Sequence, residues 1–167
     1  DKGAFKRGNS VYLPDRVVPM LPEEISADLC SLRPNEDRAC LAVRMRFNAE
    51  GEKTGEKFVR GLMRSHARLT YAQAQAAFDG KPGDEAKPVL DALDQVWEAY
   101  KKLRAARARR TPLEIDMPER KVKLDKKGRV IEIETKARFD AHKLVEEFMI
   151  QANVAAGQAL ERKNADF

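Results

Sequence analysis

The stretch RACLAVRMRFNAEGEKTGEKFVRGLMRSHARL, residues 38–69, decides the fold class of this chain. Its first ten residues, 38–47, alternate well enough for a strand, most regularly from Val43 to Phe47. The segment NAEGEKTG, 48–55, carries the glycines and polar residues of a turn. EKFVRGLMRSHARL, 56–69, can then return as the partner strand. We therefore expect a long antiparallel β-hairpin.

Helical patterns follow this hairpin. TYAQAQAAF, 70–78, begins at a threonine, which caps helix N-termini well, and ends before the breaker DGKPGD. The segments 86–110 and 140–163 repeat apolar residues at spacings of three and four, which predicts two long amphipathic helices. The apolar positions of the first are Leu90, Leu93, Trp97, Tyr100 and Leu103, and those of the second are Leu144, Val145, Phe148, Met149, Ala152, Ala156 and Leu160.

A second hairpin is predicted at RKVKLDKKGRVIEIET, 120–135. Val122, Leu124, Val130 and Ile133 alternate with polar residues on either side of the turn DKKG. The chain thus combines antiparallel hairpins with long helices that lie between and after them. Its predicted class is α+β, with the hairpins packed against the helices.

The composition fits one folded domain. The chain has 167 residues, of which 43% are apolar and 35% charged, and its net charge is +5. Positive charge permits an acidic partner such as a nucleic acid without requiring one. No segment approaches the roughly 18 consecutive apolar residues of a membrane helix. Two scattered cysteines favour neither zinc nor a disulfide framework, and we expect a cytoplasmic protein.

The opening of the chain is unusual. DKGAFKRG, 1–8, resembles the end of a helix, with basic residues late and a glycine at the capping position. The first residue is Asp1, so we expect the chain to be an excised fragment. The stretch 7–34 then carries four prolines around Tyr12 and the helix-like PEEISADL. Tyr12 is either a base-stacking residue or, as is usual in such an alternating segment, a core or edge-strand aromatic.

A search for chemistry finds no glycine-rich nucleotide loop, nucleophile elbow or zinc-protease motif. His142, Glu146 and Asn153 share one stripe of the last predicted helix. They form either a polar wall of a site or a helix face that is solvated or hydrogen-bonded to a neighbour. One histidine and one glutamate leave a metal site short of ligands. We predict no metal site here.

The run KKLRAARARR, 101–110, is the most basic part of the chain. On a helix, Lys101, Arg104, Arg107 and Arg110 fall roughly along one side, which makes them candidate contacts to RNA phosphates. The alternative is a solvated basic face at a helix C-terminus, where cations are favoured in any case. The residues alone leave both interpretations open.

Several blocks of the sequence resemble the ribonuclease II/ribonuclease R family within its catalytic domain, the RNB domain. They are 7–51, SHARLTYAQAQA (65–76), LEIDMPERKV (113–122) and 140–163, in order and across essentially all 167 residues. The resemblance implies an exoribonuclease, a hydrolase that degrades single-stranded RNA processively from 3′ to 5′ into nucleoside monophosphates with Mg²⁺. It also implies that Tyr12 packs on the nucleotide at the RNA 3′ end and that Glu146 reaches the terminal nucleotide.

The sequence departs from the family pattern in two respects. The family's metal site is a cluster of four aspartates that ends in an adjacent pair upstream of the tyrosine, and no adjacent aspartate pair occurs here. Ile115 stands where relatives often place a phenylalanine that stacks on the terminal base, so the resemblance does not carry a two-aromatic clamp over to this chain. We expect residues 1–167 to be the interior of the catalytic domain, without its upstream aspartate-rich motif and its downstream part.

This fragment is therefore predicted to hold no catalytic residue, to bind no Mg²⁺ and to be inactive alone. Its expected partners are single-stranded RNA and the remaining segments of the parent chain, with no membrane. The alternative is a non-catalytic RNA-binding or scaffold module derived from the RNB domain.

Overall fold

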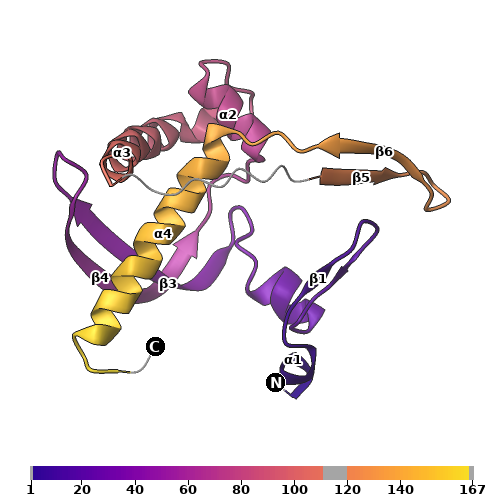
Figure 1. Cartoon of the computed structure of the whole chain (residues 1–167), viewed down its shortest axis with the longest axis horizontal. Helices are drawn as coiled ribbons and strands as arrows, with labels where there is room; N and C mark the ends of the chain where they lie inside the picture. Colours follow the sequence, from indigo (N-terminus) through magenta and orange to yellow (C-terminus); the bar gives the residue numbers. More distant parts are fainter. Residues whose placement is uncertain (1, 111–119, 166–167) are drawn as a thin grey trace. The chain divides into compact units, whose positions relative to one another are not determined.

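The computed structural model describes residues 2–110 and 120–165. The chain divides into two compact units, each described by itself below. Unit 1 comprises Asp1–Leu32 and Glu114–Ala137, and unit 2 comprises Arg33–Leu113 and Arg138–Phe167. Helices and antiparallel hairpins make up both units, so the predicted α+β class is confirmed (Figure 1).

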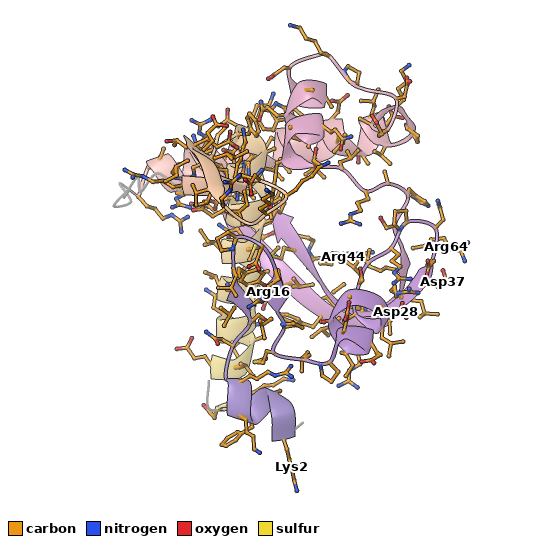
Figure 2. All side chains as sticks on the ribbon, turned by 90° about the vertical axis from the view of Figure 1, so that its right-hand side faces the viewer. Lys2, Arg16, Asp28, Asp37, Arg44 and Arg64 are labelled. Atoms are coloured by element: carbon orange, nitrogen blue, oxygen red, sulfur yellow. The ribbon has the colours of Figure 1, made fainter. Side chains whose placement is uncertain are left out.

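The long hairpin of unit 2 forms as predicted, from β3 (Asp37–Phe47) and β4 (Lys53–Arg64). The strands pair antiparallel from Asp37 opposite Arg64 to the turn, where a bulge shifts the register after Arg46. The prediction of a return strand over 56–69 is partly wrong, because β4 begins at Lys53, inside the expected turn, and ends at Arg64. The ion pair between Asp37 Oδ1 and Arg64 Nε, 2.7 Å apart, closes the open end of the hairpin (Figure 2). The hydrogen bond from Arg64 lowers the pKa of the Asp37 carboxyl.

The turn of this hairpin lies against α3 (Leu90–Ala108). Gly51 has φ +78°, and a Cβ added there would stand 2.7 Å from the carbonyl oxygen of Lys102. Both the left-handed conformation and the close approach require glycine. Arg109 extends the contact by donating a hydrogen bond to the carbonyl oxygen of Glu50.

Three helices pack together in unit 2. α2 (Tyr71–Phe78) starts with the predicted cap: the Thr70 hydroxyl accepts from the Gln73 amide, and the Gln73 side chain accepts from the Thr70 amide. Phe78 of α2 stacks on Trp97 of α3 with ring centroids 4.3 Å apart. In the segment 86–110, predicted as one helix, a 3₁₀ turn at Lys87–Val89 comes first, and α3 begins after it.

α4 (Asp140–Glu161) crosses the β3–β4 hairpin (Figure 1). The expected apolar stripe is partly wrong, because Val145 and Leu160 are exposed and Met149 is 60% exposed. The buried face is rotated from the predicted one and includes two polar residues. Its buried positions are Ala141, Leu144, Glu147, Gln151 and Ala155. At the far end of α4, Arg162 forms an ion pair with Glu56, which also pairs with Lys53 at 2.7 Å.

Unit 1 begins with α1 (Lys2–Arg7), which ends at Gly8 with φ +71°, as its sequence predicts. β1 (Val11–Tyr12) and β2 (Val17–Val18) pair as a very short hairpin, and η1 (Glu24–Leu29) is a π-helical turn. β5 (Arg120–Leu124) and β6 (Val130–Thr135) form the second predicted hairpin. Its bulge places Val130 opposite Leu124, while Ile133 lies opposite Val122.

Candidate nucleic-acid interface

Tyr12 lies on a short, braced hairpin and points into solvent. It pairs with Val17 across the two strands, and its side chain is 78% exposed. Hydrogen bonds hold the flanks: the Leu13 amide donates to the Arg16 carbonyl at 2.8 Å, and the Met20 amide donates to the Ser10 hydroxyl at 2.9 Å. Among the described residues the Tyr12 ring is therefore an exposed edge-strand aromatic and not part of a core. This exposure leaves the ring face available for stacking.

Two adjacent glutamates of α4 occupy different environments. Glu147 is 2% exposed and lies against α3, whereas the Glu146 side chain is 43% exposed. Adjacent helical residues project about 100° apart, so one faces the core and the other its edge. Of the two carboxylates, only that of Glu146 is open to a ligand in this chain.

The Glu146 carboxylate is held by two cations. Its Oε2 accepts a hydrogen bond from Arg138 Nη2 at 2.9 Å, and its Oε1 lies 3.8 Å from Arg107 Nη1. Arg138 lies two residues before α4 begins, and Arg107 comes from the last turn of α3. Each carboxylate oxygen therefore faces its own guanidinium, which restricts the rotation of the glutamate side chain.

Glu147 forms a buried polar cluster beneath this site. Its Oε2 lies 3.1 Å from Arg107 Nη1, and its Oε1 accepts from Gln151 Nε2 at 2.9 Å. A buried carboxylate is tolerated only when it is paired and hydrogen-bonded in this way. Arg107 therefore links α3 to α4 through both glutamates, and part of its charge is already neutralised.

The other members of the predicted phosphate track differ in availability. Lys101 forms an ion pair with Glu98 one turn earlier on α3. Arg104 Nη1 lies 3.8 Å from Asp140 Oδ1, a long pair that leaves most of the side chain exposed. Arg110 lies just beyond the end of α3 and has no carboxylate at ion-pair distance within residues 2–110 and 120–165. Within the described residues, the track therefore contains one cation without a carboxylate partner, two cations in solvent-exposed ion pairs, and Arg107, which pairs with the buried Glu147.

Tyr100 lies beneath the track and is buried. Burial raises the pKa of its hydroxyl above the ordinary value, and the nearby Arg104 guanidinium opposes that shift. A tyrosine in this position stays neutral near pH 7 and serves as packing beneath the basic residues.

In the polar stripe of α4, formed by His142, Glu146 and Asn153, His142 contacts neighbouring residues and Asn153 faces solvent. The His142 ring stacks on Tyr71 with centroids 3.9 Å apart, and its Nδ1 accepts from the Phe139 amide at 3.1 Å. Asn153 is exposed. His142 is thus bonded to neighbouring residues and Asn153 is solvated, which agrees with the second interpretation of this stripe.

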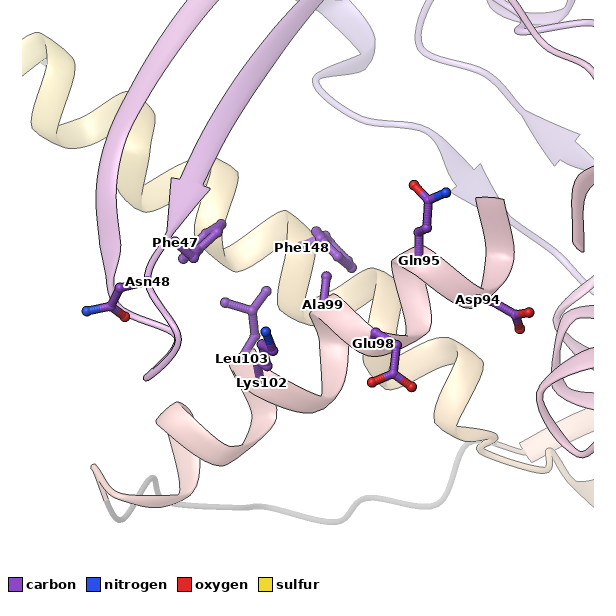
Figure 3. Close-up of a pocket in the computed structure, with 9 residues that line it drawn as sticks. All are labelled: Phe47, Asn48, Asp94, Gln95, Glu98, Ala99, Lys102, Leu103 and Phe148. Atoms are coloured by element: carbon purple, nitrogen blue, oxygen red, sulfur yellow. The ribbon is translucent and has the colours of Figure 1, made fainter. Parts of the chain in front are cut away.

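A cavity of about 550 Å³ lies between α3, the end of β3 and α4 (Figure 3). Phe47, Leu103 and Phe148 form its apolar wall, and Asp94, Glu98 and Lys102 stand among its polar residues. The acidic side chains outnumber the basic one, which disfavours a phosphate in this cavity.

No three histidine, cysteine, aspartate or glutamate side chains come together to hold a metal ion within the described ranges. The residues seen here therefore do not fit the Mg²⁺ site that the family resemblance implies.

Cys30 and Cys40 are both free thiols. Among the helices of the described residues, none has the length and apolar character needed to cross a membrane.

Sequence reasoning located Glu146 and Arg107, which the structure brings together. Tyr12 belongs to unit 1 and the basic track to unit 2. The position of Ile115, on which the second aromatic of the clamp depends, lies outside the described residues.

The sequence patterns did not indicate Arg138, Glu147 and Gln151. The burial of Glu147 has no signal in the sequence, because it depends on Arg107, 40 positions away.

Known proteins resemble this chain over almost its whole length. The chain is 40% identical over 164 residues to ribonuclease R of Vibrio parahaemolyticus and equally to ribonuclease R of Escherichia coli. Each alignment covers 97% of this chain and 20% of the relative, so the chain spans about a fifth of their length.

Solved structures share this fold. Mycoplasma genitalium RNase R in complex with double-stranded RNA superposes with a TM-score of 0.92 at 26% identity, covering 99% of this chain and 30% of that one. The same enzyme in complex with ribose-methylated single-stranded RNA gives a TM-score of 0.91 at 26% identity, over 98% of this chain and 26% of that one. The family described as the RNB domain matches residues 1–167. With sequence, fold and family match in agreement over the whole chain, this chain belongs to the RNB-domain family.

Proposed function

We propose that this chain is the interior part of the catalytic domain of a ribonuclease R-like exoribonuclease. The observation that carries the proposal is the 40% identity to ribonuclease R across 97% of the chain. The longer protein would hydrolyse single-stranded RNA processively from 3′ to 5′ and release nucleoside monophosphates. The chain's partners are single-stranded RNA and the remaining segments of the parent protein, and we place that protein in the cytoplasm.

Within this function, Tyr12 and Glu146 bind the RNA 3′ end. The exposed Tyr12 ring offers a face on which the terminal base stacks. Glu146 is the exposed member of its glutamate pair and accepts hydrogen bonds, so it suits the hydroxyl groups of a terminal ribose. Its two arginine partners keep the carboxylate in one orientation before RNA arrives.

The basic end of α3 contributes to phosphate binding. Lys101, Arg104 and Arg110 are the members of the track whose charge is most available, whereas Arg107 also serves the contact with α4. Phosphate contacts of this kind bind RNA without reading its sequence.

The chemistry itself needs groups that the described part of this chain does not supply. Metal-assisted phosphodiester hydrolysis uses Mg²⁺ held by carboxylates to generate the attacking hydroxide. The absence of such a group among the described residues also favours a second candidate, a non-catalytic RNA-binding or scaffold module. The two are distinguished by the gene sequence upstream of Asp1, where an aspartate-rich block that ends in a pair identifies the enzyme.

The role of Tyr12 is tested in the full-length gene product with Tyr12→Ala and the ring-retaining control Tyr12→Phe. Stacking contributes about 1–3 kcal/mol per base, so the alanine variant is expected to slow the last cleavages or lengthen the smallest product. Tyr12→Phe is expected to behave as wild type, because the phenyl ring still stacks. The products are sized on a denaturing gel from an end-labelled RNA. Unaltered product length and rate in Tyr12→Ala would contradict the stacking role.

A further inference from the structure

The β3–β4 hairpin gathers three basic side chains on one face. Arg44 of β3, labelled in Figure 2, stands directly opposite Lys57 of β4. Arg46 follows two residues along β3, opposite Gly55. Because glycine has no side chain, the Arg46 guanidinium lies over it, so close that a Cβ at position 55 would be 3.0 Å from Nη2. We call Arg44, Arg46 and Lys57 the hairpin cation cluster.

The register of the hairpin turns this cluster away from the helices. Successive strand residues point to opposite faces, so Phe47 and Glu56 share the other face. Phe47 lines the cavity beside α3 and α4, and Glu56 pairs with Arg162 at the end of α4. Near the turn, that face is therefore covered by the helices, whereas Leu41 and Leu62 farther along it are exposed. The cluster lies on the opposite face, where all three of its side chains are exposed.

The charge of the cluster is not balanced within the described chain. Among residues 2–110 and 120–165, no carboxylate lies at ion-pair distance from any of the three cations. Like charges directly opposite each other destabilise a hairpin. The α3 track differs, because Arg104 and Arg107 each have a carboxylate of α4 nearby and Lys101 pairs with Glu98, so that among the described residues Arg110 alone of the four has no carboxylate partner. An unbalanced cluster of this kind indicates an anionic ligand from outside the described chain.

We propose that the hairpin cation cluster binds the phosphate backbone of RNA and contributes more to that binding than the basic end of α3. The inference rests on the proposed function in RNA degradation. Two residues along a strand advance by about 6.6 Å, which suits successive phosphates of an extended strand. The arginines add bidentate hydrogen bonds to phosphate oxygens. No aromatic residue shares this face of the hairpin, so the contact is independent of RNA sequence.

The test compares three variants of the full-length gene product that each lose the same amount of charge. The first removes the hairpin cluster, the second removes available charge from α3, and the third removes exposed charge from the β5–β6 hairpin as a control. The sets are Arg44→Gln/Arg46→Gln/Lys57→Gln, Lys101→Gln/Arg104→Gln/Arg110→Gln and Lys121→Gln/Lys126→Gln/Lys127→Gln. Affinity for a labelled single-stranded poly(A) is measured by fluorescence anisotropy over a range of salt concentrations without Mg²⁺.

Each phosphate contact on a single strand contributes about −0.7 to the slope of log affinity against log salt. Loss of three contacts is expected to flatten the slope by about 2, so that a fourfold rise in salt weakens the hairpin variant about 20-fold less than wild type. The α3 variant is expected to flatten the slope less, and the control variant hardly at all. Circular dichroism of each variant shows that the fold is retained.

The outcomes separate the inference from the function on which it rests. If wild type binds RNA and the hairpin variant keeps the wild-type slope, or flattens it no more than the α3 variant, the inference is overturned and the proposed function stands. If wild type itself does not bind single-stranded RNA, both are overturned. The inference is supported if the slope of log affinity against log salt is flatter for the hairpin variant than for the α3 variant and the control variant.

Discussion

Replacing Arg107 by methionine is expected to destabilise the contact between α3 and α4. Arg107 Nη1 lies 3.1 Å from Glu147 Oε2 and 3.8 Å from Glu146 Oε1, and Glu147 is 2% exposed. Methionine has a similar length and keeps the packing of the stem, but it removes the positive charge. The buried Glu147 carboxylate would then retain one hydrogen bond, from Gln151.

Two measures bracket the size of this effect. A hydrogen bond to a charged group contributes about 1.5–3 kcal/mol, and breaking a fully buried ion pair costs about 3–5 kcal/mol. The Arg107 side chain is 28% exposed, so water can partly replace it at the carboxylate. We therefore expect a loss of about 2–3 kcal/mol in the free energy of unfolding. For a chain of this size that corresponds to a fall in Tm of roughly 4–12 °C.

The assay is thermal and urea unfolding followed by circular dichroism at neutral pH. Arg110→Met is the matched control, because Arg110 has no carboxylate partner in the described part of the chain and should change stability by less than about 0.5 kcal/mol. The double variant Arg107→Met/Glu147→Leu should recover at least about 1 kcal/mol, since it also removes the stranded charge.

An Arg107→Met variant as stable as wild type would refute this reasoning. It would mean that the guanidinium contributes nothing net to the helix contact and is free to serve RNA phosphates. A double variant less stable than Arg107→Met alone would show that Glu147 has partners other than Arg107 that matter more.

Two further predictions concern the chemistry and the pH dependence. The 167-residue chain is expected to release no mononucleotides from labelled poly(A) with Mg²⁺, because its described residues form no carboxylate cluster. Release of mononucleotides that persists after repurification and is lost in Glu146→Gln would contradict this prediction. Hydrogen bonds from Lys53 and Arg162 lower the pKa of the Glu56 carboxyl. Its stabilising effect is therefore complete above the unfolded pKa of about 4.3 and is lost as pH falls through the lower folded value. Glu56→Gln should lower Tm at neutral pH and should reduce the fall of Tm as the pH is lowered. If Tm of the variant falls at acid pH as steeply as that of wild type, other carboxylates cause the fall.

Local patterns predicted most of the elements of this fold. The alternation in 38–47, the Thr70 cap, the glycine after Arg7 and the turn DKKG each act within a few residues, and all four appear in the structure. Local hydrogen bonding and steric limits operate over these distances, so the sequence is sufficient to read them. The predicted return strand extends beyond β4, because nothing local marks Arg64 as its last residue.

Side-chain partners across the fold could not be predicted in the same way. The apolar pattern of α4 suggested Val145 and Met149 for the core, yet Glu147 and Gln151 are buried in their place. A carboxylate becomes stable in that position only when Arg107 arrives from α3. Periodicity along one helix carries no information about the charges on another.

The α+β class, the positions of the hairpins and helices, the basic run of α3 and the blocks that resemble the RNB domain can all be read from the order of the residues. Which cations of the described residues remain available to a ligand depends on how the chain folds. The tertiary structure pairs Arg107 with α4 and leaves Arg44, Arg46 and Lys57 on an uncovered face of the hairpin. The physical reason is that the availability of a charge depends on the carboxylates within a few ångströms of it, and those are brought there by the fold.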